Sequence, residues 1–297
     1  MSNIYDLFAP ESPAQEQQTF DKEAWAAKKK QEREGVFELA DNTALEVAAN
    51  SGRFQQYLDV QSRFDRYTAT NALLVLAQKP EATRLQSLDK LKEQKQYIKK
   101  TEFKKPVLII EPGDQYQRED GSVGTSYNVK RVYDVSQFEK RTVQPTVTHN
   151  ERTLIKALMS NAPVTILAAD NIPDGSGAVY APDKKTIFIK KGMEAAEIFQ
   201  CLSKELAIVE LVRNGEEPGH DGTAFAAYCA SYMICKKYNI DAAGYNFSAA
   251  PNLLEGMEAQ DVKAELTVIR NVSAEINGRM AKVLEPDRTA RDQEVRT

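Results

Sequence analysis

The chain has 297 residues, of which 42% are hydrophobic and 28% are charged, proportions that are typical of folded globular proteins with one large or two ordinary domains. The formal net charge of −4 argues against a protein that coats nucleic acid indiscriminately. No apolar run approaches the roughly 18 to 20 residues that span a bilayer, and the first residues lack a basic-then-apolar signal, so we expect a cytoplasmic protein.

The beginning of the chain predicts an arm and a first helix. Residues 1–34 are rich in Gln, Glu, Lys and Ala, and we expect them to form a mobile arm with a short helix over residues 22–33. The sequence Thr43-Ala-Leu-Glu46 has the form of a capping box and predicts the start of a helix. Ser51-Gly52 is expected to end that helix.

Two further helices and a pair of strands complete a predicted domain over residues 35–138. Large apolar residues recur at helical spacing from Phe54 to Phe64, and a third helix that begins near Thr68 must end before Pro80. The β-rich runs 107–110 and 127–133 flank a loop with Gly and Asp, which predicts a small antiparallel sheet.

Residues 139–150 are expected to form a linker to a second domain over residues 151–285 that is followed by a charged tail at 286–297. This domain is predicted to contain a strand at 164–168, a hairpin that turns at Pro182-Asp-Lys-Lys185, and helices over 153–160, 194–213, 222–238 and 258–284. The predicted fold class is therefore α+β: N-terminal helices with a small antiparallel sheet, followed by a second α+β domain.

A basic stripe in the first domain is the main candidate for binding. Residues 90–105 hold seven lysines against two glutamates, a local excess of five positive charges that would attract a phosphate backbone. Aromatic residues lie between and around these charges, as single-strand binding requires for base stacking. The candidate nucleic-acid-binding residues are Arg63, Arg66, Tyr67, Asn71, Tyr97, Lys99, Lys100, Phe103, Lys104, Lys105, Tyr127, Lys130 and Arg131.

Two less specific interpretations of these residues stay open. The composition of the Lys-rich segment is as typical of a solvated helix face as it is of a nucleic-acid-binding surface. Asn71 and Gln78, which lie seven positions apart on one predicted helix, are able to reach bases or to cap a neighbouring turn.

The first half of the chain resembles the N-terminal single-stranded-DNA-binding domain of the ArdC and LtrC-like proteins. The resemblance lies in the order and spacing of segments 66–83, which includes Tyr67 and Asn71, and of segments 98–100, 104–112 and 132–137. It implies single-stranded DNA as the partner, and conjugative transfer or antirestriction in a mobile genetic element as the setting. Where relatives have a Trp after the Pro-x-x-Thr segment, this chain has Leu88 or Leu91, and its only Trp is Trp25.

The second half resembles the zincin-like domain of the same family, with a hairpin followed by the helix that carries His-Glu-x-x-His. In zinc proteases of this kind the two imidazoles bind the metal and the Glu acts as general base. Here the corresponding degenerate metal-site positions are Lys204, Glu205 and Ile208, with Tyr228 at the third ligand position on the next helix. The resemblance implies a retained fold with lost chemistry.

The histidine content supports the loss of the metal. His149 and His220 are the only histidines, so no pair four positions apart exists, and we expect no metal, no cofactor and no enzymatic activity. Glu205 is then expected to bond a neighbouring strand or a helix cap. A metal site rebuilt from His220, Asp221 and either Glu205 or Glu210 stays open, because these are legitimate ligand types.

The sequence therefore favours a non-catalytic single-stranded-DNA-binding protein of a mobile genetic element with an inactive metallopeptidase-like domain. The second hypothesis is a protein-interaction module. In that case the cleft of the degenerate zincin domain holds a protein partner, and the helix over 258–284 offers an amphipathic face for pairing.

Overall fold

The computed structural model describes residues 21–118, 120–140, 148–172, 175–217 and 219–285. Most of the predicted arm (residues 1–20), linker residues 141–147 and the predicted tail at 286–297 lie outside these ranges. Within them, no helix combines the length and the apolar character that crossing a membrane requires.

The first helix is longer than predicted. Helix α1 (Lys22–Ala49) runs without a break through the predicted arm boundary, and Asp21 caps its start by accepting from the amides of Glu23 and Ala24. Thr43 lies inside α1, where its hydroxyl donates to the Leu39 carbonyl at 2.7 Å. The predicted helix start at Thr43 is therefore wrong, because a threonine within a helix bonds the carbonyl four residues back as readily as it caps.

Helix α2 (Ser51–Arg63) begins where the first helix was predicted to end. Asn50 closes α1 and caps α2 by accepting from the Arg53 amide, so Ser51-Gly52 opens a helix rather than closing one. Helix α3 (Ala69–Gln78) is capped by Thr68 and ends ahead of Pro80, which confirms the third predicted helix.

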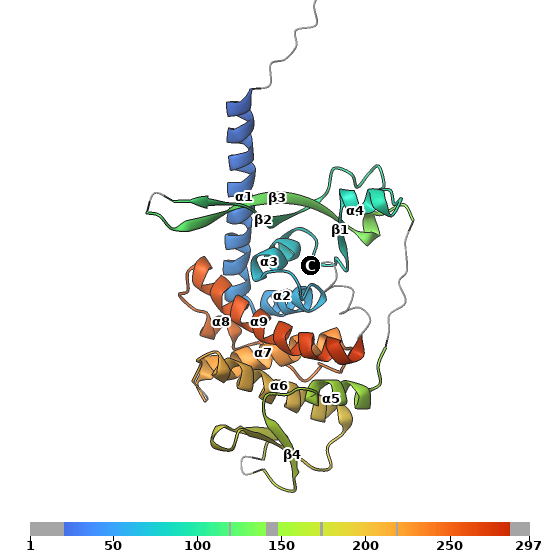
Figure 1. Ribbon diagram of the computed structural model, residues 1–297, viewed down its shortest axis with the longest axis vertical. Helices are drawn as coiled ribbons and strands as arrows, with labels where there is room; N and C mark the ends of the chain where they lie inside the picture. The colour runs from blue at the N-terminus through green and yellow to red at the C-terminus, as the bar shows by residue number, and fades with distance from the viewer. Residues whose placement is uncertain (1–20, 119, 141–147, 173–174, 218, 286–297) are drawn as a thin grey trace, which may run out of the picture.

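The first sheet lies above these helices in Figure 1. It contains β1 (Leu85–Ser87), β2 (Val107–Gln117) and β3 (Val123–Asp134) in the order β1-β3-β2, all antiparallel, with α4 (Leu88–Glu93) after β1 and a short 3-10 turn, η2 (Val135–Gln137), after β3. Strands β2 and β3 extend well into the predicted loop 112–125. Gly124 permits this, because a Cβ there would lie 2.7 Å from the Tyr116 ring that crosses it.

The second half forms a smaller sheet under a layer of helices. Strands β4 (Thr165–Ala169), β5 (Ala178–Ala181) and β6 (Thr186–Lys190) are ordered β4-β6-β5, with β4 parallel and β5 antiparallel to β6. The hairpin turn is the 3-10 turn η3 (Pro182–Lys184), as predicted. The helices are α5 (Glu151–Met159), α6 (Ala195–Arg213), α7 (Asp221–Lys237), α8 (Ala250–Leu253) and α9 (Ala259–Leu284). Two small sheets with helical layers confirm the predicted α+β class.

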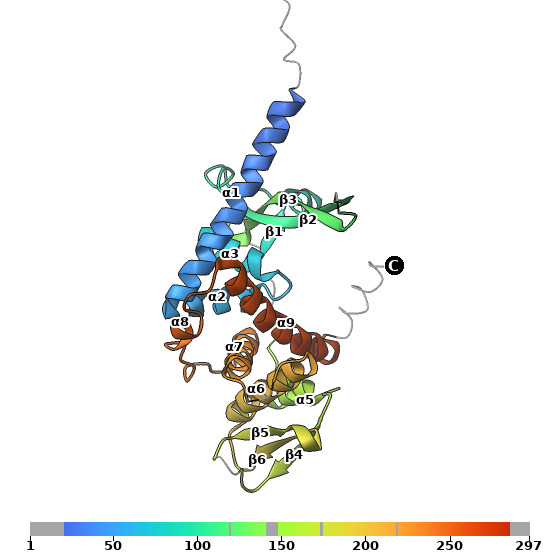
Figure 2. The same cartoon turned by 90° about the vertical axis from the view of Figure 1, so that its left-hand side faces the viewer.

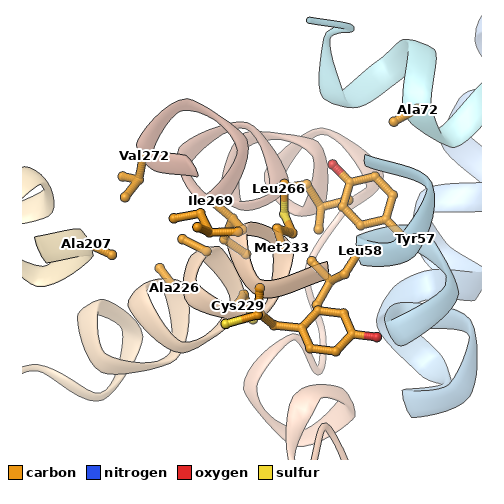
Figure 3. Packing of buried hydrophobic residues seen from close by; sticks show 14 of the residues in the cluster. Tyr57, Leu58, Ala72, Ala207, Ala226, Cys229, Met233, Leu266, Ile269 and Val272 are labelled. Carbon is orange, nitrogen blue, oxygen red and sulfur yellow. The ribbon is translucent and has the colours of Figure 1, made fainter. Parts of the chain in front are cut away.

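One hydrophobic cluster runs through both halves of the chain. Tyr57 and Leu58 of α2 lie against Cys229 and Met233 of α7 and Leu266 of α9 in this cluster (Figure 3). The apolar face of α9 is thereby buried within the chain, and it is not the free pairing face that the second hypothesis requires.

Candidate nucleic-acid interface

The outer face of the first sheet is defined by the alternation along β3. Tyr127, Arg131 and Tyr133 point to this face, whereas Val132 points to the helical core together with its cross-strand partner Val107. Helix α1 covers one end of the outer face, and α4 with the segment that follows it lies at the other end (Figure 1). Arg131 is exposed between them.

The α4 end of this face carries two exposed aromatic rings. Tyr97 is 68% exposed and Phe103 is 56% exposed. The Phe103 ring stacks on Tyr133 with 6.4 Å between the ring centroids, and the Tyr133 hydroxyl donates to the Phe103 carbonyl at 2.8 Å. These contacts hold the Phe103 backbone and ring in place while one side of the ring stays open to solvent.

A pocket of about 440 Å³ lies between these rings and a set of lysines. Its apolar side is formed by Leu88 and Leu91. Tyr97, Phe103, Lys92, Lys95 and Lys100 also line it, and we call these five residues the aromatic–lysine surface. Lys92 and Lys95 belong to the predicted basic stripe but were missed as individual site residues, because only the fold of the 88–105 segment shows which lysines face the rings.

Several lysines of the stripe interact with the chain itself, including Lys92, whose Nζ lies 3.9 Å from Asp89 Oδ1. Lys99 Nζ donates to the Ser136 carbonyl at 2.9 Å, and Lys105 pairs with Glu102 at 3.1 Å. The hydrogen bond from Lys105 is the main cause that lowers the pKa of Glu102. Lys104 is exposed. The stripe is therefore not one solvated helix face, because α4 ends at Glu93 and the rest of the segment folds back in turns.

Asn71 and Gln78 form an edge to the sheet. The Asn71 side-chain amide donates to the Ile110 carbonyl and accepts from the Ile110 amide, both at 2.8 Å. Gln78 makes the same pair of bonds with Leu108 at 2.9 Å. The two amides occupy the place of a neighbouring strand along β2. Of the two roles left open for these residues, the structure shows the bonds to neighbouring backbone, and nucleic-acid binding by Asn71 stays a prediction.

Arg63 and Tyr67 also contact other parts of the chain. Arg63 Nε donates to the Ala82 carbonyl at 3.0 Å, and its guanidinium also bonds Pro80. Tyr67 is half-buried and stacks on Phe64 at 5.3 Å. Arg270 of α9 donates to the Tyr67 carbonyl at 3.0 Å. These contacts place both residues at the corner between α2 and α3 that α9 covers, so they do not belong to the outer face.

The remaining predicted residues are Arg66, which lies near α9, and Tyr127, Lys130 and Arg131, which lie on the two faces of the first sheet. Arg270 also donates to the Arg66 carbonyl at 3.2 Å, which places the Arg66 backbone in the same corner as Tyr67. Lys130 pairs with Glu111 at 2.5 Å on the core-facing side of β3, opposite to its neighbours. Tyr127 and Arg131 remain on the outer face. Of the predicted residues, the structure therefore groups Tyr97, Lys100 and Phe103 closely, with Lys99, Lys104 and Lys105 beside them.

The degenerate metal-site helix is held by a strand. Glu205 is buried on α6, and its Oε2 accepts from the Tyr180 amide of β5 at 2.8 Å, as we expected for a carboxylate that bonds a neighbouring strand. Lys204 Nζ lies 3.3 Å from Glu205 Oε1. The Tyr228 ring packs against the Tyr245 ring at a tilt of 44° with 4.8 Å between centroids, and its hydroxyl accepts from the Asn246 amide at 2.7 Å.

These side chains do not fit a metal ion. An ammonium, an aliphatic side chain and a hydroxyl that already accepts a hydrogen bond stand at the three ligand positions expected from the sequence, Lys204, Ile208 and Tyr228. His220 caps α7 by accepting from the Gly222 amide at 3.2 Å, and Glu210 is buried in ion pairs with Arg213 and Arg279. Within the described ranges, no group of three His, Cys, Asp or Glu residues is arranged to hold a metal.

No protein-family model and no curated protein matches the sequence. Among solved structures, the Mn(II)-bound antirestriction protein ArdC of plasmid R388 is similar over 74% of this chain and 85% of that chain, with a TM-score of 0.51. The chain has an ArdC-like fold. The metal-free structure of ArdC covers 73% of this chain and 86% of its own with a TM-score of 0.49, and both structures are 13% identical to this sequence. The ArdC likeness confirms the resemblance predicted from the sequence at the level of the fold.

Proposed function

We propose that the protein binds single-stranded DNA at the aromatic–lysine surface. The observation that carries the proposal is the combination of two exposed rings with three lysines around one pocket. Unstacked bases bind to aromatic faces, and the phosphates that accompany them require cations at the rim. A buried phosphate-binding loop or a base-reading helix is not needed for such binding, which tolerates many sequences.

We also propose that the biological setting is antirestriction or conjugative transfer in a mobile genetic element. The support is the ArdC-like fold, since ArdC of plasmid R388 is described as an antirestriction protein. Within that setting we propose single-stranded DNA as the partner, because the exposed rings of the aromatic–lysine surface suit unpaired bases.

The second half is proposed to be inactive as a metallopeptidase. Support comes from Lys204, Ile208 and Tyr228 at the ligand positions and from Glu205, whose carboxylate bonds β5 rather than a water nucleophile. Elemental analysis of purified protein after incubation with Zn²⁺ or Mn²⁺ tests this proposal. A metal retained in stoichiometric amount after dialysis would contradict it.

Fluorescence anisotropy of a labelled oligothymidylate is the test of DNA binding, with duplex DNA as competitor. We expect that duplex DNA does not displace the labelled strand and that affinity falls as salt rises. The lysines release counterions from the strand when they bind its phosphates, and added salt opposes this release. Absence of binding at low salt would reject the proposal and favour the protein-interaction hypothesis.

Replacing Lys92, Lys95 and Lys100 together by Ala should weaken binding and flatten its salt dependence. With a slope of about −0.7 per neutralised phosphate on single strands, the loss of three contacts reduces the magnitude of the slope by about 2. The matched control replaces Lys184 of η3, Lys190 at the end of β6 and Lys191 directly after it, which removes the same charge far from the aromatic–lysine surface. Equal effects of the two triple variants would mean that only net charge matters.

A protein partner at the degenerate zincin cleft is the second candidate function. A pocket of about 190 Å³ lies there between Cys201, Lys204, Tyr228 and Tyr245. The Lys204→Ala variant would separate this function from DNA binding. It should bind single-stranded DNA with the affinity of the wild type, because Lys204 lies outside the aromatic–lysine surface, whereas its affinity for a protein partner at the cleft should fall.

A further inference from the structure

The N-terminal part of α1 extends past the sheet (Figure 2). The first buried residue of this helix is Val36, so the segment from Lys22 to that point contributes no buried side chain to a core. Trp25, the only tryptophan of the chain, is 51% exposed on this segment. A large exposed ring on a protruding basic helix points to a binding role rather than to packing.

A groove of about 420 Å³ separates this part of α1 from β3. Trp25, Lys29 and Arg33 line it from α1, and Tyr127 and Val129 line it from β3. Tyr127 is 42% exposed, and its ring meets the edge of the Phe37 ring at 5.9 Å. Arg33 also donates to the Tyr127 carbonyl at 3.4 Å. The groove is thus bordered by two exposed aromatic rings, and the Phe37 ring and Arg33 hold Tyr127 in position.

The groove is positively charged. Lys29, Lys30, Arg33 and Arg131 lie in or beside it, against the carboxylates of Glu32 and Glu34. Glu32 accepts from Lys29 at 2.9 Å and pairs with Arg131, and the hydrogen bond from Lys29 is the main cause that lowers the pKa of Glu32. Four cations therefore meet two carboxylates, and the remaining positive charge complements a phosphate backbone.

Strand β3 connects the groove to the aromatic–lysine surface. Tyr127 borders the groove, and Tyr133 supports Phe103 at the other end of the same face. Six residues of strand span about 20 Å, with Arg131 exposed between the two ends. A single strand that extends from one end of this face to the other would therefore pass Arg131, which pairs with Glu32.

We propose that the groove between α1 and β3 is a second subsite for single-stranded DNA, in which Trp25 and Tyr127 stack on bases and Lys29, Lys30 and Arg33 bind phosphates. This subsite rests on the proposed function, because it extends the same bound strand beyond the aromatic–lysine surface. It gives the protruding part of α1 a role that its packing does not explain.

The intrinsic fluorescence of Trp25 tests the subsite directly, since no other residue contributes tryptophan emission. Titration of the full chain with unlabelled oligothymidylate should quench this emission, and salt should reverse the quenching, in parallel with anisotropy of a labelled strand. Trp25→Ala should weaken binding roughly 5- to 150-fold, the range for loss of one base–aromatic stack. Trp25→Phe should retain much of the affinity.

Leu167→Ala is the matched control, because it truncates an exposed apolar side chain on the other sheet and should leave affinity unchanged. Binding by anisotropy with unchanged Trp25 emission and unchanged affinity of Trp25→Ala would overturn the subsite and leave the proposed function standing. Absence of any binding by the wild-type chain would overturn both. Circular dichroism confirms that α1 persists in the Trp25 variants.

Discussion

Asp134 shows how single buried polar groups hold the ends of the sheet. Its carboxylate is buried at the end of β3 and accepts from the backbone amides of Thr83, Arg84 and Ser136 at 2.8, 3.0 and 2.9 Å. Burial alone would raise the pKa of Asp134, but the hydrogen bonds from Arg84, Ser136 and Thr83 together lower it. The folded protein therefore favours the charged form of this residue.

The stability of the protein should depend on pH through Asp134. A pKa that is lower in the folded chain gives stabilisation that is present above the unfolded value of 3.8 and is lost as pH falls through the folded value. Asp134→Asn should lower the free energy of unfolding by about 1–3 kcal/mol near neutral pH, because it removes charge-assisted hydrogen bonds. Urea unfolding at several pH values measures this loss. A difference between wild type and variant that does not shrink in acid would contradict the role of the charge.

At the scale of elements, the most unusual feature is the way in which α3 closes the edge of β2. An open strand edge invites pairing with other chains, and proteins commonly cover it. Here the Asn71 and Gln78 amides each satisfy one donor and one acceptor of β2, at Ile110 and Leu108. The helix thus acts as a fourth partner of the sheet, and its polar residues serve the fold.

Asn71→Ala should destabilise the protein by about 1–3 kcal/mol, since it leaves the amide and carbonyl of Ile110 without their partner. Hydrogen exchange should become faster at the Ile110 amide, while affinity for single-stranded DNA should not change. Asn128→Ala, at an exposed position of β3, is the control for stability. Weaker DNA binding by Asn71→Ala at unchanged stability would place Asn71 in the interface.

At the scale of the whole molecule, the two halves are joined by a continuous core and by ion pairs. Lys237 of α7 pairs with Asp65 at 2.5 Å, and Lys236 pairs with Asp59 of α2 at 3.1 Å. Helix α9 contacts α1 and α3 of the first half as well as α5, α6 and α7 of the second. Helices α2, α3, α5, α6, α7 and α9 therefore lie between the two small sheets, which stand at opposite ends of this helical region (Figure 2).

Leu266→Ala in α9 should destabilise both halves together by about 2–5 kcal/mol, because it opens a cavity in the shared core. Hydrogen exchange followed in urea at the amides of β3 and, as a second probe, at those of β6 should give coincident transitions at a lower urea concentration than for the wild type. Val283→Ala, at an exposed position of the same helix, should have little effect. Separate transitions for the two probes would mean that the halves unfold independently.

Features set by local chemistry were predictable from the sequence alone. The end of α3 before Pro80, the turn that starts at Pro182, and the lengths of α6, α7 and α9 follow from proline geometry and apolar periodicity within a few residues of each site. The α+β class and the missing histidine ligands of α6 also needed no tertiary information, since they depend on the order and identity of residues.

The tertiary structure decided which polar and aromatic residues face solvent. Asn71 lies 39 positions from its partner Ile110, and Tyr127 lies just over a hundred positions from Trp25, which lines the same groove, so no local pattern reports these contacts. Lys130 and Arg131 are adjacent in sequence, yet the pleat of β3 sends them to opposite faces. A short-range pattern specifies backbone geometry, whereas the role of a side chain depends on the distant elements that fold against it.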